Sequence, residues 1–210
     1  MMPCPKAADR HWVNLTRHPC WFARNKILPL LAILCFLESS SQNFSAVSQT
    51  LNEDQIKAGY LFNFTRFVEW PAQAFATATS PMIICVVGDS PLTNLLTDAA
   101  AGKVVNGRTV SVKPLKASDE FRGCNLLFVG SAQARGAERI LERLKEMSVL
   151  SVGEAPGFAE AGGVINFFTQ DNKVKVELNL DAATHSNLKI NAKLIAVSRL
   201  VSTRSTKGGN

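Results

Sequence analysis

The sequence has few of the residues from which metal sites and many catalytic sites are built. Only three of its 210 residues are histidine, and His185 is the only histidine after residue 48. It contains no Walker phosphate-binding loop, no Gly-x-Gly-x-x-Gly pattern and no His-Glu-x-x-His pattern. We therefore expect neither a cofactor nor a metal ion, and we identify no catalytic residue from these motifs.

The sequence also lacks an apolar run long enough to span a bilayer, which takes about 20 residues. An apolar run at residues 27–37 is interrupted by one proline, follows basic residues and precedes a polar, serine-rich stretch. This order is typical of a secretory signal peptide. We expect cleavage after Ser48, with cleavage after Ser41 and an uncleaved anchor as alternatives. The remaining chain, without a membrane span, is expected to be exported.

Positive charge is not concentrated in the part of the chain that would remain after cleavage. From Gln49 onward there are 18 lysines and arginines and 15 aspartates and glutamates, a net charge of +3. These basic residues are scattered, apart from Arg199, Arg204 and Lys207 near the C-terminus. Export and the scattered charge both argue against nucleic acid as a partner.

Cysteine is scarce beyond the leader, where only Cys85 and Cys124 occur. Cys85 lies within one apolar segment, and Cys124 immediately precedes another. If these segments are neighbouring strands, their backbones are about 4.8 Å apart, which is within reach of a disulfide. An exported chain meets an oxidising environment, so we predict this disulfide, with two unrelated buried thiols as the alternative.

Apolar periodicity predicts an α/β fold: a mostly parallel sheet sandwiched by helices, with a C-terminal antiparallel hairpin. The expected organisation is a leader (1–48), one domain (49–202) and a disordered tail (203–210). Expected strands are 82–87, 109–113, 125–129 and 149–152, and the expected hairpin joins 164–169 to 173–179. Expected helices are 52–70, 92–101, 132–147, 181–186 and 193–202, with one helical turn at 118–122.

The first expected helix has Asn52 as its N-cap and Gln55 completing a capping box. Its apolar stripe predicts that Phe64 and Phe67 face the core. Phe62, Arg66 and Glu69 fall off this stripe, and Trp70-Pro71 is expected to end the helix.

Aromatic residues that the helical stripe does not explain are candidates for an exposed contact surface. One group is Phe62 and Trp70 with the charged Arg66 and Glu69. A second group is Phe158 with Phe167 and Phe168, of which adjacent strand positions place the last two on opposite faces. We select Phe62, Arg66, Glu69, Trp70, Phe158 and Phe168 as candidate partner-binding residues, with burial in the core as the alternative for either group.

A Gly-Asp-Ser sequence at residues 88–90 follows an apolar strand, as the nucleophile block of GDSL esterases does. Asp181 and His185 provide a superficial match to the remaining catalytic residues. Their spacing differs from the esterase pattern, Pro91 replaces a leucine, and no oxyanion-hole blocks are found. A turn that caps the following helix, with Asp89 or Ser90 as the cap, is the preferred interpretation.

Several blocks in this order and spacing resemble the YfiR family of periplasmic proteins, over residues 54–201. They are Ile-Lys-Ala-Gly-Tyr-Leu-Phe-Asn-Phe (56–64), Phe-Val-Glu-Trp-Pro (67–71), Ile-Cys-Val-Val-Gly-Asp (84–89) and Cys-Asn-Leu-Leu-Phe-Val (124–129). Val-Leu-Ser-Val (149–152), Gly-Gly-Val-Ile-Asn-Phe (162–167), Glu-Leu-Asn-Leu (177–180) and Lys-Leu (193–194) follow. Each block alone is a weak match, and the ordered set is specific.

The resemblance implies a periplasmic α/β regulator without known catalytic residues. It implies that the chain represses an inner-membrane diguanylate cyclase by binding the sensor domain of that cyclase, and that it forms a homodimer. Cys85 and Cys124 match a disulfide of the family, whereas a second cysteine pair found in some members is missing. A small-ligand sensor is an alternative, with its crevice at the carboxyl ends of the parallel strands, near residues 88–90 and 130–131.

Overall fold

The computed structural model describes the backbone of residues 41–204 and the side chains of residues 53–204. The chain divides into two units, Met1–Val47 and Ser48–Asn210, and the second contains the elements discussed below. The predicted signal peptide, with its apolar run at residues 27–37, lies outside the described residues. Both predicted cleavage positions fall within helix α2 (Ser41–Phe67) and stay predictions.

A mixed eight-stranded sheet forms the centre of the fold, in the order β10-β8-β7-β6-β5-β2-β4-β3. All neighbours are parallel except the antiparallel pairs β3–β4 and β7–β8. In chain order the strands are β2 (Met82–Val87), β3 (Val104–Val105), β4 (Arg108–Leu115), β5 (Leu126–Val129), β6 (Leu150–Gly153), β7 (Ile165–Gln170), β8 (Lys173–Asn179) and β10 (Arg199–Val201). The expected α/β fold with a mostly parallel sheet is confirmed.

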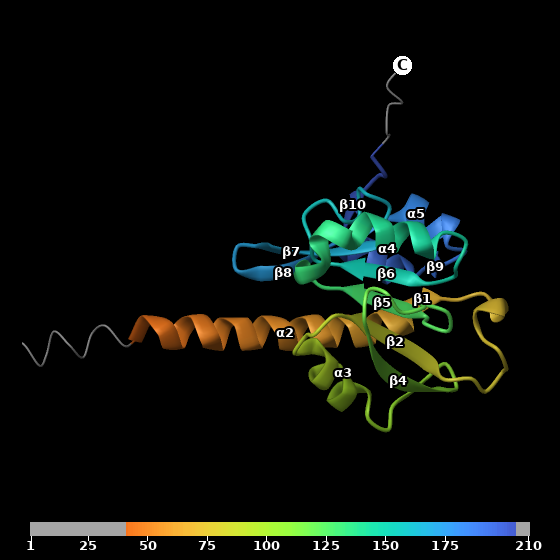
Figure 1. Cartoon of the computed structure of the whole chain (residues 1–210), viewed down its shortest axis with the longest axis horizontal. Helices are drawn as coiled ribbons and strands as arrows, with labels where there is room; N and C mark the ends of the chain where they lie inside the picture. The colour runs from red at the N-terminus through yellow and green to blue at the C-terminus, as the bar shows by residue number, and fades with distance from the viewer. Residues whose placement is uncertain (1–40, 205–210) are drawn as a thin grey trace, which may run out of the picture. The chain divides into compact units, whose positions relative to one another are not determined.

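Both faces of the sheet are covered, as the apolar sequences of its central strands require. One face packs against α2, α3 (Leu92–Ala100), α5 (Leu180–His185) and α6 (Ala192–Val197). The other packs against α4 (Ala137–Leu144), which follows the 3₁₀ helix η3 (Ser131–Gly136). Figure 1 shows α2 and α4 on opposite sides of β5 and β6.

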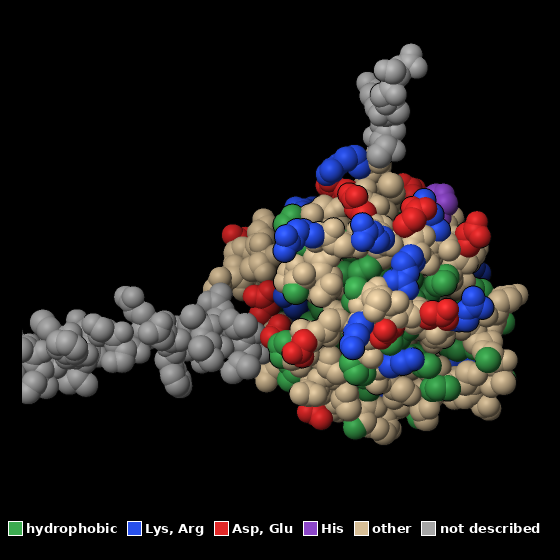
Figure 2. All heavy atoms as spheres, in the orientation of Figure 1, with side chains coloured by type: hydrophobic (Ala, Val, Ile, Leu, Met, Phe, Trp, Pro, Cys, Tyr) green, Lys and Arg blue, Asp and Glu red, His purple; other side chains and the backbone are tan. Residues whose placement is uncertain are grey.

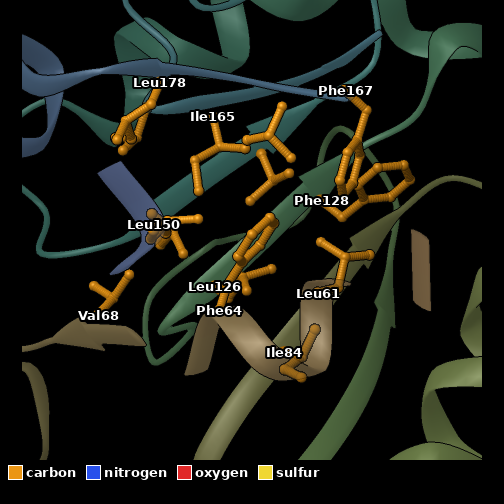
Figure 3. Packing of buried hydrophobic residues seen from close by; sticks show 14 of the residues in the cluster. Leu61, Phe64, Val68, Ile84, Leu126, Phe128, Leu150, Ile165, Phe167 and Leu178 are labelled. Atoms are coloured by element: carbon orange, nitrogen blue, oxygen red, sulfur yellow. The ribbon is translucent and has the colours of Figure 1, made fainter. Parts of the chain in front are cut away.

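The larger core lies between α2 and the sheet. Leu61 and Phe64 of α2 and Val68 after it face side chains from five strands (Figure 3). These partners include Ile84, Leu126, Phe128, Leu150, Ile165, Phe167 and Leu178. Phe64 stacks on Phe167 with ring centroids 5.8 Å apart, so the predicted core position of Phe64 is confirmed. Phe67, also predicted as core, is partly buried and packs against the same cluster.

Two turns have the backbone conformation that their residues favour. Asp171 and Asn172, between β7 and β8, have φ angles of 50° and 59°. Asn106 and Gly107, between β3 and β4, have φ angles of 51° and 77°. Left-handed backbone at both central residues matches the twist of a two-residue hairpin. The predicted hairpin of β7 and β8 is confirmed, and β3 and β4 form a second one.

The boundaries of the first predicted helix are wrong at both ends. Asn52 lies inside α2, since nothing that breaks a helix separates it from Ser41. At the other end α2 stops at Phe67, because Val68 and Glu69 form strand β1, which pairs with β9 (Lys189–Ile190). The pairing of β1 with β9 therefore ends the helix at Phe67, although the helical periodicity of the sequence extends to Trp70.

Later helices are also shorter than predicted. The segment 132–147 divides into η3 and α4, the segment 118–122 contains no helical turn, and the last segment forms α6 and then β10. The cap of α5 is Asn179, whose side chain accepts a hydrogen bond from the backbone of Ala182, and Asp181 lies in the first turn. Thr203 and Arg204, expected in the disordered tail, hydrogen-bond to Asn179 and Glu160. Residues 205–210 of that tail lie outside the described part of the chain.

Candidate functional site

One surface of α2 is not covered by the rest of the described chain. Ile56, Gly59, Asn63 and Arg66 follow one another at helical spacing, and Phe62 adjoins Gly59 and Arg66 on the same surface. Asn63 and Arg66 are exposed, Ile56 is 40% exposed, and Phe62 is half-buried. We call these five residues the outer face of α2.

Gly59 lies at the middle of this outer face. A Cβ atom built at Gly59 has no other atom within 4 Å, so nothing in the described chain requires glycine there. Glycine inside a helix costs about 1 kcal/mol relative to alanine. A glycine that the protein's own packing does not need leaves the backbone open to close approach from outside.

Glu69 and Trp70, two other predicted contact residues, follow α2. Glu69 is exposed on β1, opposite Lys189 of β9. Trp70 is half-buried, and its indole nitrogen donates a hydrogen bond to the backbone oxygen of Asn125 over 3.0 Å. Trp70 therefore anchors the segment after α2 to the start of β5, while part of its ring stays accessible.

Phe158 does not belong to an exposed surface. Its ring is only 2% exposed and sits against the backbones of Gly153 and Gly163. A Cβ at Gly153 would lie 2.3 Å from a ring carbon, and a Cβ at Gly163 would lie 2.2 Å from another. The prediction that Phe158 is an accessible aromatic is corrected, because the two glycines create the space that buries it.

Phe168 is half-buried beneath the guanidinium group of Arg199, which lies 4.0 Å from its ring centroid. Arg199 also pairs with the carboxylate of Glu177, which in turn accepts a hydrogen bond from the Asn166 amide over 2.9 Å. Glu177 alternates along β8 with the apolar Val176 and Leu178, yet its side chain is also buried, with 7% of the residue exposed. The added strand β10 covers it, since Arg199 lies in register with Glu177.

The predicted disulfide between Cys85 and Cys124 is present. It joins β2 to the residue before Asn125, which leads into β5, and β2 and β5 are adjacent parallel strands. Both cysteines are buried in the core beneath α4. The Asn125 side chain adds to this link, because it accepts a hydrogen bond from the backbone of Ile83 over 2.8 Å.

A crevice opens at the carboxyl ends of β2 and β5, where the sequence predicted a ligand site as the alternative function. From β2 the chain continues through α3 and β3 to β4, which lies beside β2 on one side, whereas from β5 it continues to β6 on the other side. This divergence is the topological switch point at which α/β proteins bind ligands. The crevice has a volume of about 370 Å³ and is lined by Asp54, Val87, Asp89, Ser90, Pro91, Leu92, Gly130, Ser131, Ala132, Gln133 and Glu154.

Glu154, which follows β6, separates this crevice from a smaller hollow of about 170 Å³ lined also by Glu53, Lys57 and Phe168. One carboxylate oxygen of Glu154 accepts a hydrogen bond from the backbone of Ser131 over 2.7 Å. The other accepts a hydrogen bond from Lys57, also over 2.7 Å, and Lys57 pairs with Glu53 as well. Lys57 therefore neutralises carboxylates on the side of the smaller hollow.

Burial and nearby charges shift the pKa values of two carboxyl groups that line the crevice. Burial alone would raise the pKa of Glu154, but hydrogen bonds from Lys57 and Ser131 hold it below the ordinary value. Burial raises the pKa of Asp54, and repulsion from Glu154 and Glu53 adds to this effect against the attraction of Lys57. The crevice is thus an acidic environment in which a further negative charge is unfavourable.

The residues of the esterase alternative have other roles. The Ser90 hydroxyl accepts a hydrogen bond from the backbone of Leu92 over 3.3 Å, as a turn residue before α3 does. His185 has a ring nitrogen 2.7 Å from the backbone oxygen of Asp181 and is not among the residues that line the crevice. Nothing described at the crevice brings His185 to Ser90.

Within the described part of the chain, no three His, Cys, Asp or Glu side chains are grouped so that they could hold a metal ion. None of the described helices is long and apolar enough to cross a membrane. On the face shown in Figure 2, acidic and basic side chains are interspersed over the described surface, with hydrophobic side chains between them.

Comparison with known protein families decides the assignment. The model of the YfiR/HmsC-like family, DUF4154, matches residues 54–199, which is more than half of the chain. The chain belongs to the YfiR/HmsC-like family. The family resemblance seen in the sequence blocks is therefore confirmed.

Two further comparisons add little to the family assignment. A crystal structure of a conserved domain protein from Vibrio cholerae O1 biovar El Tor str. N16961 is 14% identical, with a TM-score of 0.45. The match covers 58% of this chain and 54% of that one, so it spans about half of the length of that protein. The comparison with curated proteins gave no match.

Membership of the YfiR/HmsC-like family supports, in general terms, a periplasmic regulator of cyclic di-GMP signalling. The family is one of regulators and not of enzymes.

Sequence reasoning missed two features of this site. The outer face of α2 was recognised from Phe62 and Arg66, but Gly59 was not, although a glycine inside a periodic helix is a signal for close backbone approach. The Lys57–Glu154 pair joins residues 97 positions apart. No local pattern predicts that contact, because it depends on how α2 crosses the end of β6.

Proposed function

We propose that this YfiR/HmsC-like chain is a periplasmic repressor that binds the periplasmic sensor domain of an inner-membrane diguanylate cyclase. It lowers cyclic di-GMP by preferring the inactive conformation of the cyclase. A binding protein shifts such an equilibrium only by the difference between its affinities for the two conformations. A shift from 99% active to 1% active takes a preference of about ten-thousandfold.

The observation that carries the choice of surface is Gly59 at the centre of the outer face of α2. Its missing side chain lets the backbone of a partner approach, while Ile56 and Phe62 offer apolar area and Arg66 offers a charge. Aromatic and arginine side chains contribute most strongly to protein interfaces. The occupant we assign to this face is the sensor domain, and Glu69 and the accessible part of Trp70 extend the contact.

Phe168 provides a second, smaller element of the proposed surface. It lies under Arg199 and lines the hollow beside Lys57 and Glu154. Phe158 is left out of the surface, because it is buried between two glycines.

The surface is tested by complementing a strain that lacks the gene. Gly59→Gln places a long side chain on the outer face without a clash inside the protein, and it replaces glycine by a good helix former. We expect this variant to fold stably, to reach the periplasm and to leave cyclic di-GMP at the level of the deletion strain. Arg66→Gln is expected to weaken repression, whereas Arg139→Gln, at an exposed position of α4, is the matched control.

Full repression by Gly59→Gln would contradict the choice of α2 as the surface. A variant that represses normally but no longer self-associates would assign the outer face to a second copy instead. A Gly59→Gln protein that misfolds is detected by its thermal unfolding. In that case Arg66→Gln against Arg139→Gln decides the question.

We also propose that the chain forms a homodimer, as the family resemblance implies. Light scattering of the purified mature chain is expected to give twice the mass of one chain. A monomeric mass over the concentrations found in the periplasm would contradict the dimer. It would leave the proposed repression intact.

A further inference from the structure

The crevice at the carboxyl ends of β2 and β5 is not needed for a regulator that acts only by protein contact. It lies at the switch point of the sheet, and its volume of about 370 Å³ falls within the range of small-molecule sites. Gly88, directly after β2, has a φ of +91°, and the Gln133 amide packs against it so closely that a Cβ would lie 2.9 Å away. Gln133 thus bridges the loops that follow β2 and β5.

The walls of the crevice determine which charge a ligand would carry. Its charged lining residues are Asp54, Asp89 and Glu154, and among the residues whose side chains are described no lysine or arginine lines it. In the described part of the chain, neither Asp54 nor Asp89 takes part in a salt bridge, whereas Glu154 is paired with Lys57. The positive end of the α3 dipole, equivalent to about half a charge, does not offset these two carboxylates, which take part in no salt bridge among the described residues.

The remaining walls determine what else the ligand carries. Val87, Leu92 and Ala132 contribute apolar surface, and Ser90, Ser131 and Gln133 contribute hydroxyl and amide groups. A bare metal ion would find no group of three ligating side chains among the described residues. A small ligand with an ammonium group and an apolar portion would complement both the carboxylates and the apolar side chains of the crevice.

We propose that this crevice binds a small organic cation, an amine with a hydrophobic portion, with Asp54 and Asp89 as its charge partners. Bound there, the amine contacts the loops at residues 88–91 and 130–133, which follow the two central strands. The binding is a property of the folded chain by itself and does not require the cyclase partner.

The test uses the purified mature chain and three probes that share one shape. Phenethylamine carries a positive charge, phenethyl alcohol is neutral and 3-phenylpropionate carries a negative charge. Backbone amide shifts in NMR titrations report where each probe binds. We expect phenethylamine to shift the amides of residues 88–90 and 130–133, the alcohol to act more weakly and the carboxylate to have no effect there.

Variants then identify the charge partners. Asp54→Asn and Asp89→Asn are each expected to weaken phenethylamine binding by about tenfold, the loss that corresponds to one lost charge contact of about 1.4 kcal/mol. Asp98→Asn on α3 and Asp171→Asn in the β7–β8 turn are exposed controls that should leave the affinity unchanged.

Three results would overturn the proposal. One is equal binding of the amine and the carboxylate. The second is binding of phenethylamine that Asp54→Asn and Asp89→Asn do not alter, and the third is the absence of amide shifts at the crevice for phenethylamine. Repression of cyclic di-GMP is measured separately, so failure of amine binding leaves the role of the outer face of α2 standing.

Discussion

Phe158 and the two glycines beside it show how much of the fold depends on single residues. The ring occupies the space that side chains at Gly153 and Gly163 would fill, and the backbone oxygen of Phe158 accepts a hydrogen bond from the Gly163 amide over 3.0 Å. In the sequence, the Gly162–Gly163 pair stands directly before the predicted hairpin strand 164–169. The actual reason for Gly163 is a contact with an aromatic ring, which no local pattern contains.

Gly163→Ala is therefore expected to lower the free energy of unfolding by about 1–3 kcal/mol, the usual cost of overpacking a core. Gly136→Ala is the matched control, since a Cβ there meets nothing within 4 Å and the backbone is in the right-handed helical region. Denaturant unfolding of both variants measures the difference. Equal stability of Gly163→Ala and the parent chain would show that Phe158 is not confined as described.

The pair Lys57–Glu154 makes stability depend on pH. Because the pKa of Glu154 is lower in the folded chain, its contribution is fully present above about pH 4.3, the pKa of an exposed glutamate. This contribution is lost as the pH falls through the lowered folded pKa. Asp54 has the opposite effect on stability. Because its pKa is raised in the folded chain, ionisation of this carboxyl lowers the free energy of unfolding.

Glu154→Gln is expected to cost about 1–2 kcal/mol at pH 7, since it removes a charged partner from two hydrogen bonds. The loss should shrink as the pH falls through the lowered pKa of Glu154, because the carboxyl of the parent chain then also becomes protonated. Unfolding curves of the variant and the parent at several pH values check this. A difference in stability that stays constant down to pH 2 would contradict the assignment.

At the scale of elements, the buried strands and the order of the fold follow from the sequence. The apolar runs that form β2, β5 and β6 are typical of strands that are buried on both faces, in the middle of a covered sheet. Their order along the chain also predicts the crevice at their carboxyl ends. Element ends are less predictable, because pairing between distant segments decides them: β1 with β9 ends α2, and β10 with β8 replaces the end of a predicted helix.

The interaction of β10 with the sheet is testable at the same scale. Arg199 supplies the positive charge beside the buried Glu177 carboxylate and also covers Phe168. Arg199→Ala leaves a buried charge without its partner, so we expect a loss of about 1–3 kcal/mol in unfolding free energy. The double change Arg199→Ala with Glu177→Gln should recover part of that loss. A double variant less stable than the single one would contradict the pairing.

Helix α2 offers the clearest separation of stability from function. Gly59→Ala adds a methyl group in open space, so it is expected to raise the free energy of unfolding by about 0.5–1 kcal/mol. Thermal unfolding of the purified variant measures this gain. If the outer face of α2 contacts the cyclase closely, the same variant represses less well than the parent despite its higher stability. Loss of stability would instead show that Gly59 serves the packing of this chain.

At the scale of the whole molecule, the disulfide ties the centre of the sheet together. Cys85 and Cys124 are separated by 39 positions, so the bond restricts a long loop in the unfolded chain. The loop-entropy relation gives about 4 kcal/mol of stabilisation at that length. The double variant Cys85→Ala with Cys124→Ala is expected to lose about that amount in denaturant unfolding. A loss below about 1 kcal/mol would contradict the entropic account.

The activity that we propose for the whole molecule is repression of a diguanylate cyclase from the periplasm. The stable domain presents helix α2, whose residues make the proposed contacts. The most direct test measures synthesis of cyclic di-GMP from GTP by membranes of a strain that lacks the gene. Vesicles oriented so that the periplasmic side is accessible receive the purified mature chain, its Gly59→Gln variant or buffer. The account predicts that the parent chain lowers the rate in a saturable manner and that Gly59→Gln does not. An unchanged rate at saturating concentrations of the parent chain would contradict it.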